Sequence, residues 1–191
     1  PELSISLEEV LSAAKSIRGP IFGHGVSPNL PAAPIYVTQV VDVAVDPETG
    51  EVEILRVVSA QDVGFAINPL SIEGQIEGAV LQGMGYATME ELKIEDGRIL
   101  NPDLDGYILP TAQDAFDVVS VIVEEAAPEG AYGVRGVGEP PIVCTLGALA
   151  NAVYDASGVR VTRLPISPER VVKGLRENAA PPRVVSEEIP G

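Results

Sequence analysis

The chain has very little cysteine and histidine, and these shortages exclude several classes of site. Its 191 residues contain one cysteine, Cys144, and one histidine, His24. One cysteine cannot form an internal disulfide, and this pair cannot complete a structural zinc site of the Cys/His type. Four cysteines for a 2Fe–2S cluster are also missing. Because His24 lies between two glycines, we interpret it as a loop residue rather than a ligand or a member of a Ser-His-Asp triad.

Basic residues and long apolar runs are scarce as well. Lys and Arg number 12 against 28 Asp and Glu, which gives a net charge of −16. Nucleic-acid binding depends on basic contacts to phosphates, so we expect no nucleic-acid partner. No apolar run reaches the roughly 18 residues of a membrane-spanning helix, so we expect no span. The chain starts at Pro1, which favours a fragment over a naturally split subunit. No signal peptide is recognisable, and we expect a cytoplasmic location.

Glycine and proline are abundant, at 19 and 17 residues, and they separate segments of clear periodicity. Ser6 and Glu9 form a capping box at the start of the first predicted helix, and Gly158 is a stop signal for a later one. We predict helices over residues 6–18, 70–88, 140–157 and 168–175, strands over 35–46, 51–61, 118–125 and 159–164, and a short hairpin over 90–100.

This order of elements favours an α+β fold. Hairpins outnumber βαβ units, so we expect a mixed or antiparallel sheet packed against two main helices, over residues 70–88 and 140–157. Residues 1–33 are expected to form an N-terminal helix and loop. Residues 34–175 are expected to form the main domain, and residues 176–191, which contain three prolines, an extended or disordered tail.

The helix predicted over residues 70–88 carries unusual glycines and two glutamines. Each glycine costs about 1 kcal/mol relative to alanine in a helix. Gly74 and Gly78 share a face, where they allow either the close approach of another backbone or ligand, or tight packing on the sheet. Gln75 and Gln82 lie about two turns apart on nearly the same face. Their amides suit the edge of a heterocycle, but ordinary exposed glutamines would show the same spacing.

The most informative segment is Gly136-Val137-Gly138-Glu139-Pro140-Pro141. It places one carboxylate between a glycine-rich turn, which lets backbone approach a bound group, and prolines that open a helix. A single acid fixed at such a junction suits a general base. The preceding glycines do not have the G-x-G-x-x-G spacing of a dinucleotide-binding fold, and no P-loop, H-E-x-x-H or G-x-S-x-G motif is present.

Several short segments gain meaning from their order along the chain. They are Asp46-Pro47-Glu48-Thr49-Gly50, Asp62-Val63-Gly64, Asn68-Pro69, residues 73–79, residues 82–87, Glu90-Glu91, residues 136–141 and residues 150–156. In this order and spacing they resemble the C-terminal part of the large, molybdopterin-binding subunit of the xanthine dehydrogenase/aldehyde oxidase family. The resemblance covers roughly residues 34–175, so we expect this region to be a molybdopterin-binding domain.

The resemblance implies a molybdenum hydroxylase that acts on an aldehyde, an N-heterocycle or a related substrate. In that family the pterin dithiolene, not protein side chains, holds the metal, and the cytosine dinucleotide form of the cofactor is one option. The family's general base falls on Glu139, which would take a proton from a molybdenum-bound hydroxyl while hydride passes to a sulfido ligand. Gln75, Gln82 and the Gly138 amide become candidate cofactor contacts.

The resemblance also implies that this chain is not the whole enzyme. Family large subunits are several times longer, and electrons leave through 2Fe–2S centres and often FAD on other domains or subunits. We therefore expect three kinds of partner: the remaining part of the molybdopterin subunit, iron–sulfur and flavin subunits, and a small-molecule substrate. A periplasmic location would need an export signal on a partner. The alternative is a non-catalytic assembly module or fragment that binds no cofactor by itself.

Overall fold

The computed structural model describes residues 4–17, 19, 23–25, 34–128 and 130–177. The chain forms two compact units, Pro1–Pro31 and Ala32–Gly191. The first contains helix α1 (Leu7–Ile17). Its predicted capping box is confirmed, because the Ser6 amide donates to Glu9 Oε2 at 2.9 Å and the Glu9 amide donates to Ser6 Oγ at 3.2 Å.

The second unit is built on a three-stranded mixed sheet. Strands β1 (Val37–Val45) and β2 (Val52–Asp62) form the predicted antiparallel hairpin. Strand β5 (Asp117–Val123) lies on the other side of β2 and runs parallel to it, giving the order β1-β2-β5. The parallel pair is joined through helix α2 (Pro69–Thr88). The predicted α+β class with a mixed sheet is therefore confirmed. β2, α2 and β5 form a βαβ unit, a type of unit that the sequence predicted to be less frequent than hairpins.

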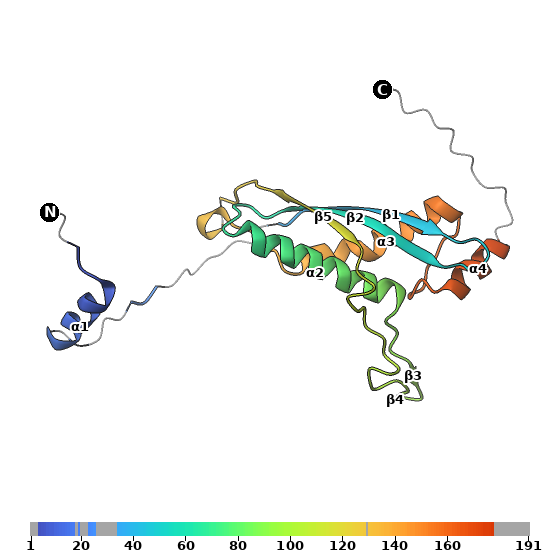
Figure 1. Cartoon of the computed structure of the whole chain (residues 1–191), viewed down its shortest axis with the longest axis horizontal. Helices are drawn as coiled ribbons and strands as arrows, with labels where there is room; N and C mark the ends of the chain where they lie inside the picture. The colour runs from blue at the N-terminus through green and yellow to red at the C-terminus, as the bar shows by residue number, and fades with distance from the viewer. Residues whose placement is uncertain (1–3, 18, 20–22, 26–33, 129, 178–191) are drawn as a thin grey trace, which may run out of the picture. The chain divides into compact units, whose positions relative to one another are not determined.

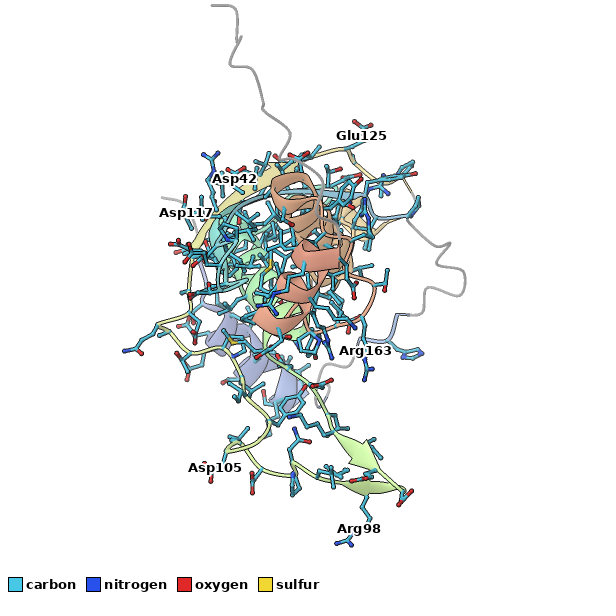
Figure 2. All side chains as sticks on the ribbon, turned by 90° about the vertical axis from the view of Figure 1, so that its right-hand side faces the viewer. Asp42, Arg98, Asp105, Asp117, Glu125 and Arg163 are labelled. Carbon is cyan, nitrogen blue, oxygen red and sulfur yellow. The ribbon has the colours of Figure 1, made fainter. Side chains whose placement is uncertain are left out.

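The connection from α2 to β5 contains the second predicted hairpin, which is shorter than expected. Only Ile94 pairs with Ile99 and Glu95 with Arg98, in strands β3 (Ile94–Glu95) and β4 (Arg98–Ile99). This segment projects from the rest of the unit (Figure 1). Arg98 and Asp105 extend from the projecting segment, and Asp42 and Asp117 from the margin of the sheet layer (Figure 2). These four charged side chains thus lie at the periphery, where water solvates them.

Helices α2 and α3 (Pro140–Ser157) cover one face of the sheet (Figure 1). α3 contacts β1 and α2, and α2 contacts β5. The core between these layers contains Val57, Ile76, Val80, Leu149 and Val153, all with no exposed surface. Four of these residues are helical, at positions 76 and 80 in α2 and at 149 and 153 in α3, and the spacing of four places each pair on one helix face.

The glycines of α2 divide into packed and open positions. A Cβ atom on Gly83 would lie 2.7 Å from the Cβ of Thr145, so this glycine allows α2 and α3 to approach closely. A Cβ on Gly74 or Gly78 would have no described atom within 4 Å. Tight packing therefore explains Gly83, whereas Gly74 and Gly78 face open space within the described part of the chain.

The end of the domain corrects two predictions. α3 ends at Gly158, whose φ of 74° is left-handed, as the stop signal predicted. The strand predicted over 159–164 is absent from this fully described segment, since Val159 instead packs against Gly174 of helix α4 (Pro168–Glu177). α4 also includes residues 176 and 177, which the sequence assigned to the tail. The rest of the predicted tail, residues 178–191, lies outside the described residues.

No helix that the structure describes is both long and apolar enough to span a bilayer.

Candidate active site

Glu139 occupies the N-cap position of α3, directly before Pro140 and Pro141. Prolines at the first helical positions lose nothing, because those amides have no partner within the helix. The Glu139 side chain does not cap the helix, and its backbone has φ −98° and ψ −24°. The residue is exposed, and no hydrogen bond or ion pair of its carboxylate involves a described residue. The carboxylate is thus held only through its backbone.

A hollow of about 660 Å³ lies beside Glu139. Its lining combines the backbone of residues 136–138 with apolar side chains: Ile35, which precedes β1, Val37 at the start of β1, and Val143 from the first turn of α3. Glycines at 136 and 138 leave backbone groups accessible to a bound molecule. The arrangement places one carboxylate at the edge of a largely apolar cavity, which is typical of small-molecule sites.

The glycine-rich segment before Glu139 is anchored to the end of β2. The Phe65 amide donates to Gly133 O at 2.9 Å, and the Arg135 amide donates to Val63 O at 2.9 Å. Gly64 has a φ of +66° and approaches Gly133 O so closely that no Cβ would fit. The segment that the sequence predicts to be irregular is therefore fixed by backbone hydrogen bonds.

A buried ion pair reinforces this anchor. Arg135 Nε lies 3.0 Å from Asp62 Oδ2, and the two side chains are only 9% and 10% exposed. Asp62 Oδ1 also accepts the Gly64 amide at 3.0 Å. The sequence analysis did not identify this pair, although an aspartate at the end of an apolar strand was a usable signal.

Two glutamines missed by the sequence analysis hold the backbone on either side of Glu139. Gln61 Nε2 donates to the carbonyls of Gly136 and Val137, each at 3.2 Å. Gln39 Nε2 donates to Pro141 O at 2.7 Å. Both glutamines come from the sheet, and only the fold reveals that they reach the segment around Glu139.

The two glutamines predicted as cofactor contacts occupy different places on α2. A Cβ on Gly138 would lie 3.8 Å from Gln75 Oε1, so the structure brings these two residues together. Gln75 also lines a second hollow of about 250 Å³, which shares Val137 with the first. Gln82 lies about 10 Å further along the helix axis, at 1.5 Å per residue. Its Nε2 donates to the Tyr86 hydroxyl at 3.0 Å.

Cysteine and histidine, the two metal-ligand residue types that are rare in this chain, lie in different compact units. Cys144 lines the first hollow, but burial raises the pKa of its thiol, which favours the protonated form at neutral pH. His24 is exposed and belongs to the other compact unit. Among the described residues, no three His, Cys, Asp or Glu side chains gather as a metal ion would require.

Comparison with known proteins identifies the family. Residues 3–116 match the family described as the molybdopterin cofactor-binding domain. The chain belongs to this family. The match includes Gln75 and Gln82, whereas Gly138 and Glu139 lie beyond it.

Individual relatives of this molybdopterin-binding domain agree with the assignment. A putative xanthine dehydrogenase molybdenum-binding subunit of Escherichia coli (strain K12) is 39% identical over 72% of the chain and 19% of its own length. The gamma subunit of the 6-hydroxypseudooxynicotine dehydrogenase complex of Paenarthrobacter nicotinovorans is 39% identical, over 71% of the chain and 18% of its own length. The chain thus spans about one fifth of these curated relatives.

Solved structures share the fold. The aldehyde oxidoreductase from Desulfovibrio gigas superimposes with a TM-score of 0.68 at 33% identity, over 74% of this chain and 15% of that one. Quinoline 2-oxidoreductase from Pseudomonas putida 86 superimposes with a TM-score of 0.67 at 31% identity, over 71% of this chain and 18% of that one. The resemblance to the xanthine dehydrogenase/aldehyde oxidase family is therefore confirmed.

Proposed function

We propose that this domain contributes the general base, Glu139, to a molybdenum hydroxylase that works only as a larger complex. The reaction would hydroxylate a carbon of an aldehyde, an N-heterocycle or a related substrate with oxygen from water. The observation that carries the proposal is the placement of Glu139, a carboxylate without a partner among the described residues at the edge of the 660 Å³ hollow. Relatives that are molybdenum-binding subunits favour this role over a non-catalytic assembly module.

The residues around Glu139 fit a molybdopterin. The cofactor carries its own sulfur ligands for the metal, so it needs from this chain an open backbone and amide groups for its polar edges. Gly138 and Gln75 offer both and lie close together, since a Cβ on Gly138 would be 3.8 Å from Gln75 Oε1. Gln82 remains a weaker candidate contact, because it donates to Tyr86. When bound, the cofactor supplies the metal centre that accepts the electrons of the oxidation, and its cytosine dinucleotide form is one option.

Glu139 would act by proton transfer. Its carboxylate would accept a proton from the attacking oxygen that derives from water, and a positioned base of this kind contributes about 10²–10⁴-fold to a rate. In this chain the carboxylate is exposed, whereas proton transfer in active sites is favoured by exclusion of water. We infer that the remaining part of the molybdopterin subunit covers Glu139 and completes the substrate site.

The same proposal defines the other partners. Iron–sulfur and flavin subunits or domains would carry electrons away from the cofactor, and a small molecule would be the substrate. We place the complex in the cytoplasm, or in the periplasm if a partner carries an export signal.

A single substitution in the assembled holoenzyme tests the role of Glu139. Glu139→Gln keeps the shape of the side chain but removes its basicity, so kcat should fall by about 10²–10⁴-fold. Molybdenum and pterin content, measured by mass spectrometry, should not change. Glu48→Gln, at an exposed turn, is the matched control and should keep normal turnover. Near-normal turnover of Glu139→Gln at full molybdenum content would contradict the proposal.

A further inference from the structure

Side-chain amides from two adjacent strands grip the backbone before and after Glu139. Gln61 on β2 donates to Gly136 O and Val137 O at 3.2 Å each. Gln39 on β1 donates to Pro141 O at 2.7 Å. Gln39 pairs with Ser59 in the sheet register, and Gln61 is two residues beyond Ser59. Because side chains alternate along a strand, all three point to the sheet face that α3 covers.

The orientation of Gln61 is determined by what it contacts. Two carbonyl oxygens lie on one side of its amide, so the NH₂ group must face them and the oxygen must face away. The residue has no exposed surface, and Oε1 has no hydrogen-bond partner among the described residues. Burying an unpaired amide oxygen destabilises a fold. An apolar side chain would avoid this cost but could not hold the two carbonyls.

The orientation of Gln39 is fixed by a second buried residue. The Thr145 hydroxyl lies 2.9 Å from Gln39 Oε1 and 2.8 Å from Pro141 O. On its other side, Gln39 Nε2 donates to Ser59 Oγ at 3.1 Å. Thr145 and Ser59 have no exposed surface. Gln39 is therefore held from both sides, with its NH₂ group directed at the first turn of α3.

We propose that Gln39 and Gln61 are positioning residues for Glu139. The carboxylate has no partner of its own among the described residues, so its location follows from the backbone at residues 136–141, which these two amides hold at both ends. This inference rests on the proposed function of Glu139. In a reaction that requires a well-placed base, a displacement of about 1 Å can cost about a hundredfold in rate.

Hydrogen exchange of the purified chain tests whether the two glutamines hold this backbone, independently of catalysis. Gln61→Met and Gln39→Met keep a long unbranched side chain but remove the donors. Each should speed amide exchange in peptides covering residues 133–144 more than elsewhere, as measured by mass spectrometry. Val153→Ala, a core substitution in the later part of α3, is the control and should not loosen that segment selectively. Unchanged exchange there in both glutamine variants would overturn the proposal.

Turnover of the assembled holoenzyme tests the consequence. Each glutamine variant should lower kcat by about tenfold to a hundredfold at unchanged molybdenum content, whereas Val153→Ala should not. In a Glu139→Gln background the same substitutions should cause no further loss, because the group they position is gone. A further loss of equal size would mean a general structural effect and would overturn the positioning role, as would normal kcat in both single variants.

Failure of the proposed function gives a different pattern. If Glu139→Gln kept normal turnover, Glu139 would not be the base and the positioning role would fall with it. Selective exchange changes at residues 133–144 would then remain as a purely structural grip. If Glu139→Gln lost turnover while neither glutamine variant did, the proposed function would stand and only this inference would be overturned.

Discussion

Replacing Gly83 by alanine would press a methyl group into Thr145 where α2 contacts α3. The new Cβ would lie 2.7 Å from Thr145 Cβ and 2.9 Å from Thr145 Cγ2. Thr145 is fully buried and its hydroxyl contacts Gln39 and Pro141, so it cannot move aside freely. Overpacking of this kind costs about 1–3 kcal/mol. Against this, alanine gains about 1 kcal/mol of helix propensity over glycine.

Gly78→Ala provides the matched control in the same helix. It gains the same propensity, and its methyl would meet no described atom within 4 Å. The control should therefore be stabilised by up to about 1 kcal/mol. The difference between the two variants isolates the clash, so Gly83→Ala should be less stable than Gly78→Ala by about 1–3 kcal/mol.

Urea denaturation of the purified chain, followed by circular dichroism, measures this difference. Thermal unfolding gives an independent value, since 1 kcal/mol shifts Tm by about 2–4 °C in a chain of this size. Equal free energies of unfolding for the two variants would refute the close contact of α2 with α3 at Gly83. A stability loss for Gly78→Ala would instead refute the open surface assigned to that position.

Three further predictions concern the ionisable groups. Asp62→Ala leaves the buried Arg135 guanidinium without its carboxylate partner and should cost about 3–5 kcal/mol, measured by urea denaturation. The hydrogen bond to Glu90 raises the pKa of Tyr107 to about 12 from 10.0, so its stabilisation should be complete below pH 10.0 and vanish as pH rises toward 12. Ultraviolet titration should show a late-titrating tyrosine that Tyr107→Phe removes. Burial raises the pKa of Cys144, so alkylation should be slow and should accelerate on unfolding.

The parts of the fold that follow from local signals could be predicted from the sequence. The capping box at Ser6 and Glu9 and the left-handed Gly158 each act within a few residues, and the helix over 140–157 was placed correctly. The segment 159–164 has the composition of a strand, but no strand in the described part of the chain pairs with it, and Val159 packs on α4 instead. β-propensity reflects how well side chains pack on a half-buried surface. The side chains of this segment pack in that way without backbone pairing to another strand.

In the candidate site, too, one part could be predicted from the sequence and another could not. Glu139 stands out because its glycines and prolines are adjacent in sequence. The glutamines that hold the backbone around Glu139 do not stand out in the sequence. Gln61 and Gly136 are 75 residues apart, and Gln39 and Pro141 are 102 residues apart. A glutamine in a strand is also an unremarkable surface residue until the fold shows which face it occupies. Contacts of such long sequence separation leave no local periodicity from which to predict them.

The rigidity of the backbone around Glu139 and the exposure of its carboxylate have separate origins. The candidate site would therefore depend on the rest of a larger enzyme for only one of these two properties. The backbone of residues 133–141 is fixed from within the chain by the end of β2, by the Asp62–Arg135 ion pair and by the two glutamines. The exposure of the carboxylate can be changed only by covering it. Changes to the internal contacts should therefore act on the placement of the proposed base, whereas changes to the proposed covering partner should act on its access to water and substrate.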